Sequence, residues 1–218
     1  MNEKITRNRS MSDVRIFAWE LAGFAFIVIL GIPLHSGFAW CGHYPGIAWL
    51  TPVNESTWEH FKLCFWPGLV FALVEMKAFG ATADSFWRAK ALGLLSMPVA
   101  IILFFYGYTA FLGHHVLAAD ILIFIAAVAI GQAISYRFLK SAASRSRWWS
   151  TVVTALALAF VWFTYDPPRL FLFKDPITGE YGISEQQDQT LGAARDIQRK
   201  VEDSRFVKAD RGLFAIKK

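Results

Sequence analysis

The sequence predicts an all-α protein, a polytopic membrane helix bundle of about five transmembrane helices with a C-terminal extramembrane tail. Two observations predict this class. Apolar residues make up 55% of the 218 residues, which is more than an ordinary soluble domain carries. These residues also gather in runs of about 20, the length that a helix needs to cross a bilayer. We therefore expect the lipid bilayer to be the main partner of the protein.

Five apolar runs have the length of membrane spans. They cover residues 16–38, 62–82, 90–112, 115–137 and 148–165. The first run is too long for the apolar part of a signal peptide and lacks a small-x-small cleavage pattern, so we expect it to remain as the first span. The last run must end at Pro167-Pro168, because consecutive prolines cannot continue a helix.

The chain changes character after residue 165, which divides it into a bundle (1–165) and a tail (166–218). Residues 166–183 combine bulky apolar side chains with an Asp-Pro-Ile-Thr-Gly turn signal, so we expect them to pack on the bundle. Residues 184–218 are polar with scattered apolar positions, and this pattern fits either a loose segment or an amphipathic helix.

Basic residues are sorted to one side of the predicted spans. Four precede the first span, three lie between spans two and three, and four lie between spans four and five. The loops on the opposite side, residues 34–61 and 113–116, carry none, and Lys62 lies at the edge of span two. The tail holds ten basic residues, but the rule counts those close to the membrane, here Arg169 and Lys174. Since short cytoplasmic loops are enriched in Lys and Arg, we expect a cytoplasmic N-terminus and an outer C-terminus, in a bacterial cytoplasmic (inner) membrane.

In a membrane protein Lys and Arg are topology signals, and here they are sorted by side, so the net charge of +5 does not indicate nucleic-acid binding. We therefore expect no nucleic-acid partner. A homo-oligomer remains an open alternative. Cys41 and Cys64 both fall on the outer side, where oxidation is chemically possible, and the sequence leaves their pairing open.

The predicted topology brings all five histidines to the outer side of the membrane. Four ionisable residues near this surface are candidate catalytic residues and candidate ligands of a divalent metal such as zinc: His35, Glu55, His60 and Asp120. Asp120 lies about one turn inside the outer surface, where a carboxylate needs a partner. We therefore expect these four residues, with Asn54, to share a polar pocket.

The stretch PVNESTWEHFKL, residues 52–63, also has a structural interpretation. Ser56-Thr57-Trp58-Glu59 matches the capping box, in which a serine caps the third amide of a helix and a glutamate reaches back. We therefore assign Ser56 and Glu59 to a structural cap. Lys62 could neutralise a nearby carboxylate, and an ion-paired network without metal is then the competing interpretation.

Other polar residues lie within the spans. Glu75 is expected to extend to the inner interface, while Gln132 and Ser135 are expected to form hydrogen bonds between helices. If the protein were a small transporter, Glu20, Glu75, Asp120 and Gln132 would line its path.

The sequence contains no HExxH, GxSxG or Walker motif and no paired CxxC, so no reaction is assigned by motif. Three functions remain open: a metal-assisted hydrolase of a lipid or envelope substrate, a small transporter or ion-handling protein, and a non-catalytic envelope or assembly factor. Ionisable groups concentrate at the outer surface rather than along the depth of the bilayer, which favours the first and third.

The chain resembles a family of bacterial multi-pass membrane proteins known as domain of unknown function 6512. The resemblance rests on PVNESTWEHFKL, on Leu34-His35 followed by Trp40 and Gly42, and on the tail stretches DPP at 166–168 and DPITGEYG at 175–182. It supports the membrane architecture and points to the same outer residues, but it implies no established activity. Where the family motif has an aromatic–acid pair after the first histidine, this chain has Phe38-Ala39.

Overall fold

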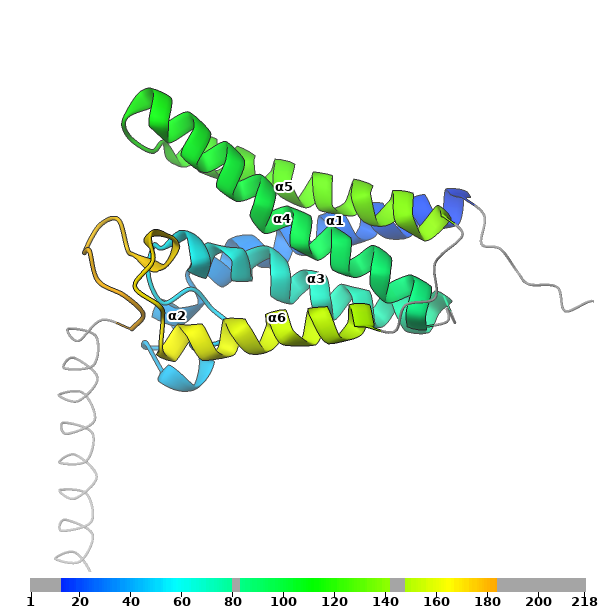
Figure 1. The fold of residues 1–218 in the computed structure, drawn as a ribbon, viewed down its shortest axis with the longest axis horizontal. Helices are drawn as coiled ribbons and strands as arrows, with labels where there is room; N and C mark the ends of the chain where they lie inside the picture. The colour runs from blue at the N-terminus through cyan, green and yellow to red at the C-terminus, as the bar shows by residue number, and fades with distance from the viewer. Residues whose placement is uncertain (1–12, 80–82, 142–147, 184–218) are drawn as a thin grey trace, which may run out of the picture.

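The computed structural model describes residues 13–79, 83–141 and 148–183, and within these residues it is helical apart from loops and one isolated bridge. The segment 184–218, for which two alternatives were left open, lies outside the described residues. The elements in order are α1 (Asp13–His35), α2 (Gly37–Trp40), η1 (Pro45–Ile47), α3 (Thr57–Phe79), α4 (Ala83–Leu112), α5 (Leu117–Lys140), α6 (Trp148–Tyr165) and η2 (Phe171–Phe173). The five long helices run along one axis as a bundle (Figure 1).

Within the described residues, four helices are long and apolar enough to cross a membrane: α1, α4 from Phe86 onwards, α5 and α6. The fifth long helix, α3, has 23 residues but carries more charge, and most of its charged side chains are buried. It packs against α1 and α4, and its Phe65 and Cys64 are fully enclosed. The prediction of an all-α bundle of about five membrane helices is confirmed, with α3 as its most buried member.

The observed helix bounds correct four of the five predicted spans. The first helix ends at His35 instead of 38, and a separate short helix, α2, follows it. The second begins at Thr57 instead of 62, because the cap at Ser56 starts the helix before the apolar run does. The third begins at residue 83 instead of 90, and the fourth covers 117–140 instead of 115–137. The fifth helix, α6, covers residues 148–165, the bounds of the last predicted run.

Helices α4 and α5 approach closely where two glycines face each other. A side chain on Gly93 would lie 2.8 Å from the Gly131 carbonyl oxygen, and one on Gly131 would lie 2.9 Å from the Gly93 carbonyl oxygen. Small residues at such positions let membrane helices pack backbone to backbone. Beyond this contact, towards the turn at residues 113–116, the α4–α5 hairpin diverges from the rest of the bundle (Figure 1).

A buried polar network connects four helices at a distance from that turn. Lys90 of α4 donates to Glu20 of α1 at 2.7 Å and also pairs with Glu75 of α3. Ser135 and Gln132 of α5 donate to the Glu20 carboxylate and carbonyl, at 2.7 and 3.0 Å, which confirms their predicted interhelical role. The interpretation of Glu75 as an interfacial side chain was wrong, because it is fully buried beside Lys90.

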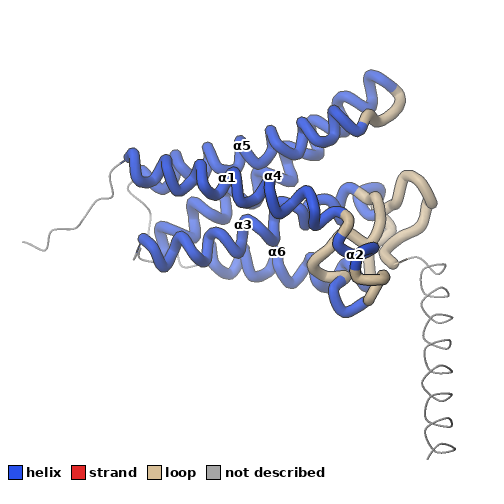
Figure 2. Tube along the Cα trace, turned by 180° about the vertical axis from the view of Figure 1, so that it is seen from behind, coloured by secondary structure: helices blue, strands red, loops and turns tan. Residues whose placement is uncertain are grey.

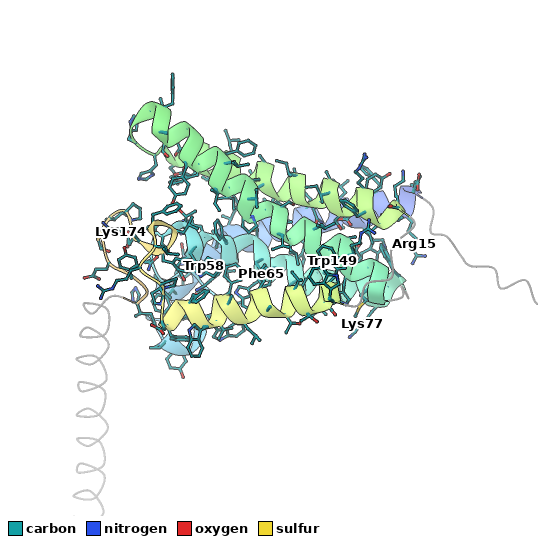
Figure 3. All side chains as sticks on the ribbon, viewed as in Figure 1. Arg15, Trp58, Phe65, Lys77, Trp149 and Lys174 are labelled. Atoms are coloured by element: carbon teal, nitrogen blue, oxygen red, sulfur yellow. The ribbon has the colours of Figure 1, made fainter. Side chains whose placement is uncertain are left out.

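The loop between α1 and α3 and the tail residues 166–183 gather at one end of the bundle (Figure 2). Trp58 and Lys174 mark this end, and Arg15 and Lys77 mark the opposite one (Figure 3). The tail is held there by Phe173, which is buried and stacks on Trp58 with ring centroids 4.6 Å apart. The end that carries the loop and the tail also carries the candidate site.

Candidate functional site

The start of α3 is built by a network that extends beyond an ordinary capping box. Ser56 Oγ accepts from the Glu59 amide at 3.4 Å, as a helix cap does. The Glu59 carboxylate, however, accepts from the amide of Val53 at 3.0 Å, while the Ser56 amide donates to Asn54 at 2.9 Å. The network thus fixes residues 53–56 in a defined loop ahead of the helix.

Lys62 completes this network from inside the protein. Its ammonium group is fully buried and donates to Glu59 at 2.6 Å, to the Ala48 carbonyl at 2.9 Å and to the Thr51 carbonyl at 3.3 Å. All of its protons therefore have acceptors, as a buried charge requires. The ion pair, Lys62 with Glu59, holds the loop 48–53 against α3.

The tail closes over this loop through Asn54 and a hairpin turn. The Asn54 amide nitrogen donates to the Gly182 carbonyl at 2.8 Å. Asp175 is buried and accepts from the amides of Ile177 and Thr178, and Gly179 adopts a positive φ of 76° that favours glycine at this bend. Asn54 therefore connects the loop to the tail, and both of its polar groups are used.

Three of the four candidate residues converge on one point. The Nε2 atoms of His35 and His60 lie 3.1 Å apart, and Glu55 Oε2 lies 3.5 Å from the first and 3.4 Å from the second. We call these residues the His–Glu triangle. His35 ends α1, His60 is in the first turns of α3, and Glu55 is supplied by the loop that the Glu59–Lys62 pair holds in place.

The triangle has the dimensions of a tetrahedral metal site. Zinc binds imidazole nitrogen and carboxylate oxygen at about 2.0–2.1 Å, so two ligands of a tetrahedral ion lie about 3.4 Å apart. The three observed separations are close to that value. Their side chains are 41%, 43% and 30% exposed for His35, Glu55 and His60, so a fourth coordination position would be open to a substrate or to water.

The second ring nitrogen of His60 is also arranged as in a metal ligand. Its Nδ1 lies 2.9 Å from the Ser56 carbonyl oxygen. A carbonyl only accepts, so Nδ1 carries the proton, and in the neutral ring Nε2 turns its lone pair to the triangle. Such a contact commonly orients a histidine that binds metal.

Without a cation, hydrogen bonds between Glu55 and the two histidine rings would hold the triangle together. These hydrogen bonds place the pKa of the Glu55 carboxyl well below its ordinary value, and the one from His35 has the largest effect. Glu55 is therefore a carboxylate at any physiological pH. A bound cation would take the place of the proton between His60 and Glu55, so its binding would release that proton.

Asp120 lies outside the triangle. It accepts from the Tyr108 hydroxyl and lies 3.2 Å from Nδ1 of His115, while the Tyr108 oxygen accepts from the Val116 amide at 3.0 Å. Asp120 is thus partnered, as its depth requires, but by residues of its own helical hairpin. Tyr108 and His115 were not among the candidates, although the short turn between the two helices predicts their proximity to Asp120.

Two cavities meet at the triangle. The larger, about 410 Å³, lies among α1, α3, α4, α5 and the tail. All four candidate residues line it, so Asp120 faces the same space from another wall. The smaller, about 310 Å³, lies between the loop and the tail and is lined by Asn54 and Asp175. His35, Glu55 and Ile177 line both cavities.

The two cysteines are free thiols, Cys41 exposed and Cys64 buried. The sequence left their pairing open, and the structure shows no disulfide between them.

Comparison with known proteins identifies a family without an assigned activity. No curated protein and no solved structure is significantly similar to the chain. A family model described as "Family of unknown function (DUF6512)" matches residues 8–183. The match covers the whole described part of the chain and ends where the packed tail ends. The chain therefore belongs to the DUF6512 family of unknown function.

Proposed function

We propose that the protein is a metal-dependent hydrolase that acts at the outer surface of the bacterial cytoplasmic membrane. The observation that carries this proposal is the triangle of His35, Glu55 and His60, whose three ligand atoms lie 3.1–3.5 Å apart at the junction of two cavities. Two histidines, one carboxylate and an open fourth position form a donor set typical of catalytic zinc.

A divalent cation held there would polarise a carbonyl or phosphoryl oxygen of the substrate and lower the pKa of a bound water. Glu55, His35 and His60 would hold the ion, and Ser56 would orient His60 through its carbonyl oxygen. We assign proton transfer to Asp120, the carboxylate that lines the same cavity without joining the triangle. Its bond from Tyr108 would keep it oriented towards that space.

The alternative of a transporter receives less support. Glu20, Glu75 and Lys90 are buried and held together by ion pairs, and none of the three lines either of the two cavities described above. Of the residues named for a transport path, Asp120 lines the larger of these two cavities, and Glu20, Glu75 and Gln132 line neither. Glu20 and Glu75 thus lie in the buried network and Asp120 lies in the cavity near the other end. A transport path would require such groups to follow one another across the bilayer.

The orientation belongs to this proposal as well. The triangle lies at the end of the bundle opposite Arg15 and Lys77, two of the residues that the sequence assigns to the cytoplasm (Figure 3). A hydrolase in this orientation would work on an envelope substrate from outside.

Metal analysis of the purified protein tests the proposal directly. We expect about one zinc or manganese ion per chain in the wild type, and loss of that ion in His35→Ala, His60→Ala and Glu55→Gln. His114→Ala is the matched control, because His114 is exposed, lies outside the triangle and has its ring nitrogen Nδ1 beside the Leu112 carbonyl. Absence of stoichiometric metal in the wild type, after purification without chelators and addition of zinc, would show the triangle to be an ion-paired network.

Hydrolysis is measured separately with chromogenic carboxyl-ester and phosphodiester substrates. We expect turnover that a chelator abolishes and zinc restores. Asp120→Asn should keep the metal and lose turnover, which separates its role from that of the three ligands. A metal-loaded protein with no turnover on either substrate class would restrict the site to metal binding and refute the hydrolase.

A further inference from the structure

The larger cavity is amphiphilic along its length. Its polar end holds His35, Glu55 and His60, and its remaining wall is mainly aliphatic and aromatic, with Leu63, Ile101, Phe105, Ile121, Ile123 and Phe124. All of these apolar residues belong to α3, α4 and α5, the long helices of the bundle. A purely water-soluble substrate would leave this apolar wall without a partner.

The cavity also reaches the outer surface of the bundle on its apolar side. Three of its apolar lining residues on the long helices are strongly exposed: Ile32 of α1 by 55%, Leu117 of α5 by 73% and Ile121 of α5 by 44%. Helices α1 and α5 are both long and apolar enough to cross a membrane. Side chains exposed on such helices face lipid, so the cavity opens towards the bilayer between them.

The shape of the bundle explains this opening. The α4–α5 hairpin is packed tightly at Gly93 and Gly131 and diverges from α1 and α3 towards its turn (Figure 1). The cavity lies where the helices diverge, and the tail residues Pro176 and Ile177 also line it. The smaller cavity continues from there to the outside, between the loop and the tail.

We propose that this cavity binds a membrane lipid, with one acyl chain along the apolar wall and the headgroup linkage at the His–Glu triangle. The lipid would move in sideways from the bilayer between α1 and α5, and the hydrophilic part of its headgroup would extend into the smaller cavity. A volume of about 410 Å³ lies within the range of small-molecule sites, about 300–1,000 Å³, so the cavity has room for the linkage and part of one acyl chain while the rest of the lipid stays in the bilayer. This inference rests on the proposed function for the reaction at the linkage, but the binding of the lipid does not require metal.

Photo-cross-linking tests the inference without relying on turnover. The protein is reconstituted in vesicles of phosphatidylethanolamine and phosphatidylglycerol that contain a phosphatidylglycerol with a diazirine at the end of one acyl chain. Cross-links are mapped by mass spectrometry in zinc-loaded and in chelator-treated protein. We expect cross-links at Leu63 and Ile101, deep in the cavity, that unlabelled lipid suppresses in a saturable way.

Two variants should remove these cross-links by filling the opening, Ile121→Trp and, from the facing helix, Ile32→Trp. Leu122→Trp is the matched control, because Leu122 is 66% exposed and does not line the cavity. It should retain the cross-links at Leu63 and Ile101. Metal content and thermal stability are measured for each variant, so a misfolded variant is recognised and the other one is used.

The outcomes separate the two proposals. Cross-links confined to outward residues such as Leu158 of α6, or unchanged in both tryptophan variants, would overturn the lipid site even if the wild type binds zinc. Saturable cavity cross-links in a protein that binds no metal would support the lipid site and refute the metal-dependent hydrolase.

Discussion

Replacing Lys62 by methionine should destabilise the protein more than almost any other single substitution outside its apolar core. The ammonium group is completely buried and donates to one carboxylate and two carbonyls. Methionine fills much of the same space but donates nothing. The Glu59 carboxylate would keep one donor, the Val53 amide, and the carbonyls of Ala48 and Thr51 would lose a donor.

Breaking a buried ion pair by removing one partner costs about 3–5 kcal/mol, because the remaining charge is left uncompensated. For a protein of this size, 4 kcal/mol corresponds to a decrease in melting temperature of roughly 10 °C. Glu59→Gln should cost less, because Lys62 retains both carbonyls and glutamine can still accept from Val53. The double variant should be more stable than Lys62→Met alone, because it leaves no unpaired charge.

The assay is thermal unfolding of the four proteins in one detergent, followed by size-exclusion chromatography of the remaining folded fraction. Lys77→Met is the control, because Lys77 is an exposed lysine in the last turn of the same helix. A melting temperature of Lys62→Met equal to that of Lys77→Met would refute the reasoning. So would additive losses in the double variant, since these would mean that the two charges do not stabilise each other.

Four further predictions follow from the other contacts. Asn54→Asp should retain the hydrogen bond from the Ser56 amide but lose the one that Asn54 donates to the Gly182 carbonyl, at a cost of about 1 kcal/mol. Hydrogen exchange should therefore become faster in residues 175–183 and stay unchanged in α6. Lys90→Met should lower the free energy of unfolding by about 3–5 kcal/mol in the same unfolding assay, because it leaves two buried carboxylates without their lysine. Glu75→Gln should have a small effect, because Glu20 still pairs with Lys90 and Glu75 already has an oxygen without a hydrogen bond. Zinc affinity, measured by competition with a chelating dye, should decrease as the pH falls and His60 gains a proton. Burial alone would lower the pKa of His60, but the hydrogen bonds to Glu55 and to the Ser56 carbonyl outweigh burial and raise this pKa, so the decrease should begin above the ordinary histidine value of about 6.5. The pKa of Glu55 is lowered, so its carboxylate stays ionised in this range, and a decrease that begins only near pH ~4 would contradict the assignment. A membrane-impermeant maleimide should label Cys41 in intact cells and leave the buried Cys64 unmodified, and labelling of Cys41 only after lysis would reverse the proposed orientation.

The bundle could be predicted from the sequence because membrane helices leave a local signal. Each apolar run is visible by itself, and the double proline after residue 165 placed the end of α6 correctly. The bounds of α3 were predicted less well, since the helix begins within a polar stretch and its first turns are stabilised by Ser56, Glu59 and Lys62 rather than by apolar residues. A hydropathy pattern does not report such contacts.

The candidate site could be predicted only as a set of residue types on one surface. The predicted topology placed His35, Glu55 and His60 at the same end of the helices, but their convergence depends on how α1 and α3 pack and on the loop between them. Asp120 was predicted on the same side and at a similar depth, yet it belongs to the α4–α5 hairpin, which diverges from the bundle. There its carboxylate accepts a hydrogen bond from Tyr108. Depth follows from sequence, whereas the angle between helices depends on close contacts such as Gly93 with Gly131.

The burial of charge along α3 has a consequence for how the protein is made. Glu59, Lys62 and Glu75 all face protein rather than lipid, so each of these charges needs a protein partner once the helix lies in the membrane. A charged residue raises the free energy of inserting a helix, by about 2.5–3.5 kcal/mol at the helix centre and by less near its ends. Glu59 has its partner Lys62 on the same helix, whereas Lys90, the partner of Glu75, lies on α4. We therefore expect α3 to enter the lipid more readily together with α4 than alone.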